Sequence, residues 1–115
     1  MNVWQSKGVP ANKLVMGIPF YGRSFVLNNP SNHLPGKMAR SKKEGFSGPY
    51  TEENGFLSYF EICTMAKEST WLHKKDDDGN VYMHSGNKWV GYDTPDAVGR
   101  KINYVKTKGY GGGMI

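Results

Sequence analysis

The sequence predicts an α/β fold in which one strand–helix–strand repeat carries an inserted α+β subdomain. Three observations predict it. A short apolar run, residues 13–19, ends at its proline as a buried strand does. Over residues 71–92 the pattern changes to a period of two, which indicates antiparallel strands. A helical pattern over residues 95–108 then leads into a second apolar run, residues 110–115. A helix on a parallel sheet implies more strands than this chain contains.

The first part of the chain is predicted to run from the end of a helix into the first strand. Residues 2–7 are followed by glycine and proline stop signals, and the strand over residues 13–19 comes next. Beyond it, Gly22 tolerates backbone angles that other residues avoid, so Tyr21 and Arg23 are predicted to splay into a cleft instead of alternating across a sheet. The two side chains suit a polar, ring-shaped ligand, and the alternative is that they cover apolar surface.

Residues 26–49 are predicted to form a loop region with one or two short strands at most, because they are rich in Asn, Pro, Gly, Ser and Lys. Loops this long are functional or belong to an inserted subdomain. His33 lies in this stretch and is expected to be a solvated surface residue, with a ligand contact as the alternative. The densest positive run, residues 40–43, also lies here and shows no helical stripe.

Residues 54–68 are predicted to form a helix with one buried face. That face consists of Phe56, Tyr59, Phe60, Cys63 and Ala66, which follow the i, i+3, i+4, i+7 spacing. Acidic residues before a helix suit the positive end of its dipole, so Glu53 is interpreted as helix-start chemistry or as a ligand contact. Cys63 on this face is interpreted as a small buried apolar residue.

An antiparallel meander is predicted from the three short runs that follow. Asp78 and Gly79 give a strong hairpin turn signal between residues 71–75 and residues 81–84, and a second turn leads to residues 88–92. The consecutive aspartates lack the alternating ligands of an EF-hand, so they are interpreted as a solvated turn. His73 and His84 are expected to lie near each other across the hairpin, but two histidines without a third ligand do not make a metal site.

The last helix begins at Asp93-Thr-Pro-Asp96, where a capping side chain is followed by proline in the first turn. It is predicted to run to about Lys108 and to stop at Gly109, with Val98, Ile102 and Val105 as its apolar stripe. Both ends of the chain look cut within secondary structure, so the sequence is expected to be part of a longer protein.

The composition argues against several classes of function. The 115 residues allow one domain, and the net charge of +5 is spread along the chain, which disfavours nucleic-acid binding. No apolar stretch is long enough to cross a membrane, and the N-terminus is too polar for a signal peptide. Cys63 has no internal partner, so either the protein is intracellular or the partner lies outside this chain. The aromatic share of 13% suits carbohydrate binding or a small β-rich core.

Four blocks, in order, closely resemble the family 18 chitinases of animals. The blocks are KLVMGIPFYGRSF (13–25), GFLSYFEIC (55–63), WVGYD (89–93) and KGYGGGMI (108–115). The resemblance implies part of a (β/α)8 TIM barrel. Residues 1–21 would hold a helix end and the seventh strand, residues 22–92 the inserted α+β chitinase insertion subdomain, and residues 93–115 the seventh helix and eighth strand.

The function that the resemblance implies is hydrolysis of β-1,4-linked N-acetylglucosamine polymers, with retention of configuration and attack by the substrate's own acetamido oxygen. The family's acidic motif on the fourth strand and its Met-x-Tyr-Asp motif on the sixth are not in this sequence. The chain alone is therefore expected to be inactive and to supply a wall of the cleft. A chitinase-like lectin without hydrolase activity is the alternative, and a small sugar-binding module that folds alone is a third.

The resemblance also assigns individual residues. Tyr21 and Arg23 match the family's Tyr-Gly-Arg, whose side chains reach the substrate, and Glu53 would hold Arg23 or share its ligand. Phe56 stands where a residue packs on a sugar, and Met114 matches a methionine beside the reaction centre. No metal or cofactor is implied, the expected partner is chitin or a chitooligosaccharide, and the full-length protein is expected to be a secreted monomer. Cys63 matches a cysteine bridged to one beyond the eighth strand, which suits an oxidising compartment.

Overall fold

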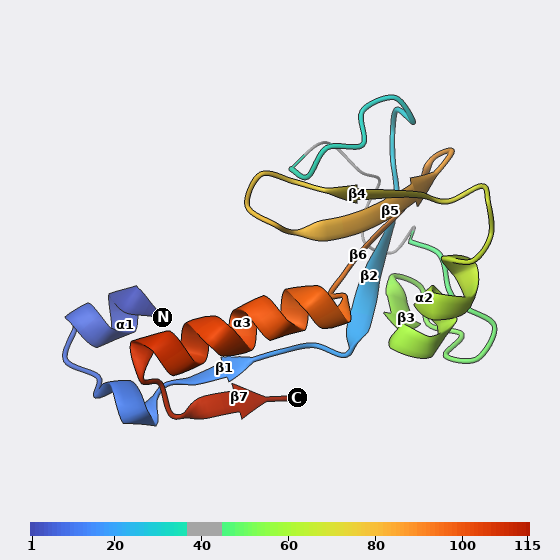
Figure 1. Cartoon of the computed structure of the whole chain (residues 1–115). Coiled ribbons are helices and arrows are strands. Elements are labelled where there is room, and N and C mark those ends of the chain that lie inside the picture. Colours follow the sequence, from blue (N-terminus) through green and yellow to red (C-terminus); the bar gives the residue numbers. More distant parts are fainter. Residues whose placement is uncertain (37–44) are drawn as a thin grey trace. The chain divides into compact units, whose positions relative to one another are not determined.

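The computed structural model of the chain describes residues 1–36 and 45–115, and these form two compact units (Figure 1). Unit 1 comprises residues 1–19 and 94–115, and unit 2 comprises residues 20–93. The unit boundaries fall where the first apolar run ends and where the last helix begins. Unit 2 is therefore inserted in the sequence of unit 1. The positive run at residues 40–43 lies outside the described residues.

Unit 1 contains the strand–helix–strand repeat that the sequence predicts. Its elements in order are α1 (Asn2–Ser6), the 3-10 turn η1 (Ala11–Lys13), β1 (Val15–Gly17), α3 (Pro95–Lys108) and β7 (Gly112–Met114). β1 and β7 pair in parallel, with Val15 opposite Gly112 and Gly17 opposite Met114 (Figure 1). The predicted strand over residues 13–19 is confirmed but shorter, because its first residue completes η1.

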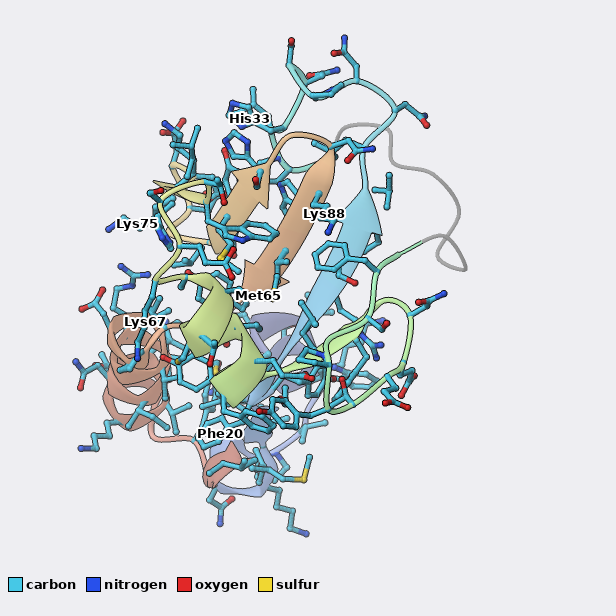
Figure 2. The ribbon with its side chains drawn as sticks, turned by 90° about the vertical axis from the view of Figure 1, so that its right-hand side faces the viewer. Phe20, His33, Met65, Lys67, Lys75 and Lys88 are labelled. Atoms are coloured by element: carbon cyan, nitrogen blue, oxygen red, sulfur yellow. The ribbon has the colours of Figure 1, made fainter. Side chains whose placement is uncertain are left out.

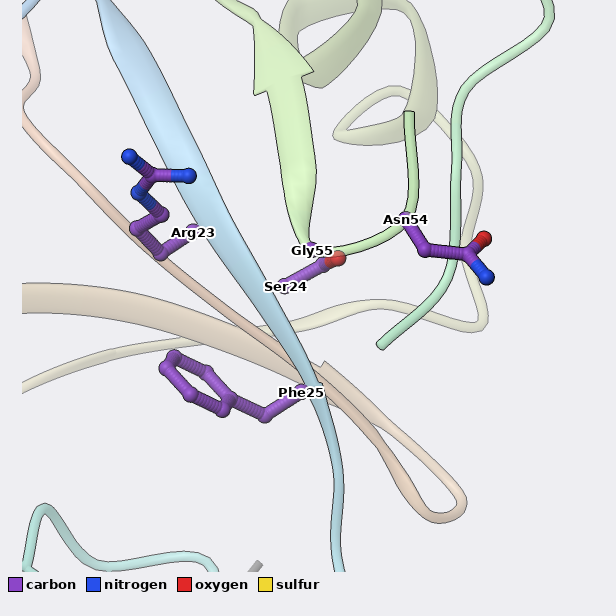
Figure 3. Close-up of a pocket in the computed structure, with 5 residues that line it drawn as sticks. All are labelled: Arg23, Ser24, Phe25, Asn54 and Gly55. Carbon is purple, nitrogen blue, oxygen red and sulfur yellow. The ribbon is translucent and has the colours of Figure 1, made fainter. Parts of the chain in front are cut away.

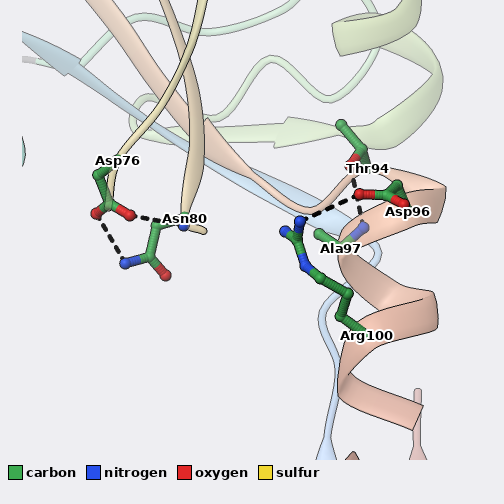
Figure 4. A network of polar contacts seen from close by, with 6 residues as sticks. All are labelled: Asp76, Asn80, Thr94, Asp96, Ala97 and Arg100. Carbon is green, nitrogen blue, oxygen red and sulfur yellow. Dashed lines mark hydrogen bonds and ion pairs between the residues drawn. The ribbon is translucent and has the colours of Figure 1, made fainter. Parts of the chain in front are cut away.

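The helix α3 forms where the capping and stop signals indicate. The Thr94 hydroxyl accepts a hydrogen bond from the Ala97 amide at 3.2 Å, and Pro95 occupies the first turn (Figure 4). Gly109 ends the helix with φ at 65°, a left-handed conformation that glycine adopts without strain. Ala97 and Val105 are its buried residues. Within the described part of the chain, no helix has both the length and the apolar character needed to cross a membrane.

Unit 2 is built on an antiparallel sheet with the strand order β3-β2-β6-β5-β4. The strands are β2 (Tyr21–Val26), β3 (Phe56–Ser58), β4 (Leu72–Lys75), β5 (Val81–Ser85) and β6 (Lys88–Tyr92). β4, β5 and β6 are successive neighbours, so the predicted meander is confirmed. At the β4–β5 turn the Asp76 carboxylate accepts hydrogen bonds from the backbone and side-chain amides of Asn80, both at 2.8 Å (Figure 4).

One face of this sheet forms the hydrophobic core with the helix α2 (Tyr59–Met65). The buried residues of the core are Leu57, Ile62, Trp71, Met83 and Val90. Met65, on the last turn of α2, packs against them while Lys67, just beyond it, is exposed (Figure 2). Since a buried apolar side chain contributes about 1.5–3 kcal/mol, this cluster is the main stabilising element of unit 2.

The helix predicted over residues 54–68 is present but shorter than predicted. Residues 56–58 form the strand β3, which pairs with β2, and the helix begins only at Tyr59. Ser58 caps it in a capping box with Glu61, so the residues before Phe56 are not a helix start. The predicted buried face is not the observed one, because Phe60 is exposed whereas Leu57 and Ile62, which are not on that face, are buried.

The prediction that Tyr21 and Arg23 splay from a strand end is also wrong. Both belong to the regular strand β2, in which Tyr21 and Arg23 are exposed whereas Gly22 and Ser24 are buried. Side chains that alternate in this way lie on opposite faces of the sheet. The described residues 28–36 and 45–49 contain neither helix nor strand, in agreement with the predicted loop region.

The histidines are arranged differently from the prediction. His73 lies opposite Met83, so it is on the other face of the sheet from His84. His84 is buried and stacks instead on His33, with ring centroids 4.0 Å apart. His33 (Figure 2) is not a solvated surface residue. Its Nδ1 lies 3.2 Å from the Tyr82 hydroxyl, and its carbonyl accepts a hydrogen bond from the Trp89 indole. No cluster of metal-ligating side chains occurs among the described residues.

We expect unit 2 to lose stability as the pH falls below about 6.5. Burial, together with the nearby His33 and Lys74, lowers the pKa of His84, so the unfolded chain takes up a proton at a higher pH than the folded one. The stability that neutral His84 contributes is fully present above the pKa of its imidazole in the unfolded chain. It is lost as the pH falls towards the lower pKa of His84 in the folded chain. Unfolding midpoints measured between pH 7.5 and pH 5 will check it. His84→Phe should flatten the profile, whereas His73→Gln should leave it unchanged.

Candidate functional site

Three side chains of unit 2 form an aromatic and cationic cluster, in which Tyr21 and Arg23 are exposed and Phe56 is half-buried. The rings of Tyr21 and Phe56 stack with centroids 5.1 Å apart and planes 29° from parallel. The Arg23 guanidinium carbon lies 5.2 Å from the Tyr21 centroid and 5.6 Å from that of Phe56. A cation at these distances is attracted by the ring quadrupoles. The sequence-predicted residues Tyr21, Arg23 and Phe56 are therefore brought together.

The pairing of β2 with β3 creates this cluster. Arg23 lies directly opposite Phe56, and Tyr21 lies opposite Ser58, so the three side chains share one face of the sheet. The buried residues Leu57 and Gly22 occupy the other face, where Ile62 packs against them. The apolar core thus fixes the register, and the register presents the cluster to solvent.

A pocket of about 250 Å³ lies beside the cluster (Figure 3). It is lined by Arg23, Ser24, Phe25, Asn54 and Gly55. Its backbone is fixed, because the Ser24 amide donates to the Gly55 carbonyl at 3.2 Å and the Gly55 amide donates to the Phe46 carbonyl at 3.3 Å. Gly55 has φ at 83°, so a residue with a Cβ would be strained there.

The segment that precedes β3 is held by the buried carboxylate of Glu61. Glu61 is 2% exposed and accepts five hydrogen bonds from described residues, at 2.8–2.9 Å. The donors are the backbone and hydroxyl groups of Ser58 and Thr51 and the Tyr50 amide. Burial by itself would raise the pKa of this carboxyl, but the hydrogen bonds from Thr51, Ser58 and Tyr50 together outweigh it and lower the pKa to about 2.

The other two predicted site residues, Glu53 and Met114, belong to different units. Glu53 is exposed and forms no ion pair with Arg23 among the described residues, so of the two expected roles only a shared ligand stays a prediction. Its carbonyl accepts the Phe56 amide at 3.2 Å. Met114 belongs to unit 1, where it ends β7 with its side chain 63% exposed and its carbonyl bonded to the Ile18 amide at 2.7 Å.

The arrangement suits binding more than acid catalysis. Stacked aromatic rings offer apolar faces, and the guanidinium offers donors to hydroxyl or carbonyl oxygens, a combination that matches a sugar ring. A general acid needs a carboxyl whose pKa is raised. The carboxyl groups with a resolved shift in the described chain, Glu61 and Asp76, both have a lowered pKa.

Comparison with known proteins identifies the family. Residues 1–115 match the sequence model of the family described as glycosyl hydrolases family 18. The chain belongs to this family. It is 45% identical over 120 residues to an endochitinase of Manduca sexta, covering 99% of this chain and 22% of that protein. It is 39% identical over 112 residues to chitinase-3-like protein 2 of Homo sapiens, covering 97% of this chain and 28% of that protein.

Solved family 18 structures share the fold of this chain. A Group IV chitinase of Ostrinia furnacalis superposes with a TM-score of 0.91 at 36% identity, covering 98% of this chain and 30% of that one. Human YKL-39 is described as a pseudo-chitinase with retained chitooligosaccharide binding. It superposes with a TM-score of 0.89 at 39% identity, covering 99% of this chain and 30% of that one. The chain thus spans less than a third of the length of each of these relatives.

Sequence reasoning missed Glu61, the residue that organises the segment before β3. The signal was present, since Ser58 followed three residues later by Glu61 is the capping-box pattern. The sequence carries no comparable signal for the stacking of His33 on His84. The two residues are distant in sequence, and only the folding of the loop onto the sheet brings their rings together.

Proposed function

We propose that this chain is the part of a chitinase that supplies a substrate-binding wall, with chitin or a chitooligosaccharide as the ligand. The observation that carries the proposal is the cluster of Tyr21, Phe56 and Arg23 beside an open pocket. Relatives support it, since a Group IV chitinase was solved with allosamidin and YKL-39 with the tetrasaccharide GlcNAc4. The two stacked rings would pack on the apolar face of a sugar, and the guanidinium would donate to its oxygens.

The parent protein, in this proposal, is a retaining family 18 glycoside hydrolase in which the substrate's acetamido group takes part in catalysis. Unit 1 would be the seventh-strand and eighth-strand region of a (β/α)8 barrel, and unit 2 the chitinase insertion subdomain. The parallel pairing of β1 with β7 and the intervening α3 are consistent with neighbouring barrel strands. The acidic motif of the family is not within the 115 residues, so the general acid would come from elsewhere in the parent protein.

Secondary roles in this proposal fall to Glu53 and Met114. Glu53 is exposed and free to meet a sugar hydroxyl, and Met114 offers an exposed thioether at the end of β7. Secretion is proposed as well. Cys63 is half-buried and has no disulfide within the chain, which leaves it available for a partner in an oxidising compartment.

Tyr21→Ala is expected to weaken chitotetraose binding about tenfold, since it removes one of the two stacked rings. Isothermal titration or the change in tryptophan fluorescence on titration will measure it. Tyr50→Ala is the matched control, because Tyr50 is an exposed tyrosine outside the cluster and stacks only on Phe60 among the described residues. Equal affinities for wild type, Tyr21→Ala and Tyr50→Ala would contradict the proposal.

A chitin-binding lectin without hydrolase activity is the second candidate. Its support is the 39% identity to YKL-39, a pseudo-chitinase that retains chitooligosaccharide binding. The two candidates make the same prediction for Tyr21→Ala and differ in turnover. Release of sugar from chitotetraose by the parent protein would favour the chitinase, and tight binding without release would favour the lectin.

A further inference from the structure

The loop that follows β2, residues 28–36, is attached to the sheet of unit 2 through His33. His33 is the only residue of this loop that is not exposed. The Trp89 indole donates to the His33 carbonyl at 2.9 Å, and the His33 Nδ1 lies 3.2 Å from the Tyr82 hydroxyl. His33 is therefore the residue that docks the loop on the sheet.

The ring beneath His33 is a buried histidine with an unpartnered nitrogen. His84, on β5, stacks on His33 with centroids 4.0 Å apart and planes 11° from parallel. It is 7% exposed, and its Nε2 has no hydrogen-bond partner among the described residues. A protonated imidazole carries an N–H on both nitrogens. His84 can therefore bind a proton beneath the docked loop only by burying an N–H that has no acceptor there, which costs free energy.

The titratable groups around His84 also oppose its protonation. Lys74 on β4 lies opposite Tyr82, on the same face of the sheet as His84. Burial lowers the pKa of His84, and the nearby His33 and Lys74 lower it further. Burial and the Asp76 carboxylate raise the pKa of Tyr82, so its hydroxyl stays neutral over the range in which histidine titrates. A proton on His84 thus meets positive charge and no compensating partner.

We propose that His33 and His84 form a pH-sensitive latch, which holds the loop of residues 28–36 on the sheet at neutral pH and releases it in weakly acidic solution. When the loop leaves the sheet, the His84 Nε2 meets water and takes up a proton more easily, so acid favours the released state. The latch holds above the ordinary histidine pKa of about 6.5 and is lost as the pH falls towards the lower pKa of docked His84. The release is local and leaves the sheet and its core folded. No sugar takes part, so the latch is independent of the proposed function.

The test follows the indole N–H resonances of the full chain by NMR, from about pH 7.5 to about pH 5. The Trp89 resonance is expected to shift towards that of a solvated indole, because release removes the His33 carbonyl as its acceptor. Trp4 is 63% exposed and gives the solvated reference. Trp71 belongs to the hydrophobic core and should keep its resonance, since the core stays folded. Nuclear Overhauser contacts between the His33 and His84 rings should disappear over the same range.

Three variants separate the latch from other titrations. His84→Phe keeps a ring in the stack but cannot take up a proton, so the Trp89 resonance should no longer depend on pH. Tyr82→Phe removes the hydroxyl that meets the His33 Nδ1 and should move the transition to higher pH, because the docked state is weakened. His73→Gln is the matched control, since His73 lies on the other face of the sheet, and it should titrate as the wild type does.

Several results would overturn the latch. A Trp89 resonance that stays constant in the wild type, or that still titrates in His84→Phe, would do so. If Trp89 and Trp71 change together, the acid transition is global unfolding of unit 2 and the loop is not released on its own. Should His84→Phe fail to fold, Tyr82→Phe decides the question, and an unmoved transition in that variant contradicts the latch.

Discussion

Replacing Glu61 by glutamine is expected to lower the free energy of unfolding by about 3 kcal/mol. One carboxylate oxygen accepts the Tyr50 and Thr51 amides, and the other accepts the Ser58 amide together with two hydroxyl groups. The NH2 group of glutamine must therefore face at least one backbone N–H whichever way it is turned. In a site that is 2% exposed, water cannot replace the lost acceptor.

The pH dependence gives an independent check on Glu61. Because the folded pKa of about 2 lies below the ordinary value of 4.5, the carboxylate contributes stability above pH 4.5 and loses it as the pH falls towards 2. Urea unfolding at pH 7 and pH 3 should show this loss in the wild type and a smaller one in Glu61→Gln. Glu68→Gln, at an exposed position, is the control and should resemble the wild type at both pH values.

Gly22→Ala is expected to destabilise unit 2 by about 2 kcal/mol, because the added methyl group enters a filled space. A Cβ at Gly22 would run into the terminal carbon of Ile62 and would lie 3.1 Å from both the Val90 side chain and the Gly91 carbonyl. These groups belong to the core and the neighbouring strand, so none can move aside freely. Thermal and urea unfolding will measure the change.

Gly99→Ala is the matched substitution for Gly22→Ala. A Cβ at Gly99 meets no atom within 4 Å, and the residue lies in the exposed part of α3, so alanine should stabilise the chain by about 0.5–1 kcal/mol. Gly22→Ala is therefore expected to lower the free energy of unfolding, and Gly99→Ala to raise it. A neutral or stabilising Gly22→Ala would mean that the core beneath β2 is not closely packed.

Much of the fold could be predicted from local signals in the sequence. The helix α3 has its cap at Thr94 and its stop at Gly109, and the hairpin between β4 and β5 has its own turn residues, so neither depends on distant contacts. β3 could not be predicted in the same way. Three residues are too few to show a period of two, and Phe56 is a strand residue only because Arg23 lies opposite it.

The candidate site was predicted in part. The resemblance of residues 13–25 and 55–63 to the family gave Tyr21, Arg23 and Phe56, and the structure brings these three together. The sequence did not indicate that Phe25 and Asn54 line a pocket, because that pocket depends on where β3 stops pairing with β2. Residue patterns do not determine where a strand pair ends.

The strand order of unit 2 leaves β4 at one edge of the sheet, with all four of its residues exposed. An open edge of this kind can pair with the same edge of another molecule and start aggregation. Lys74 and Lys75 place two positive charges on that edge, and two copies brought edge to edge would have to bring these charges together. The sheet therefore carries its own protection against self-association at the β4 edge.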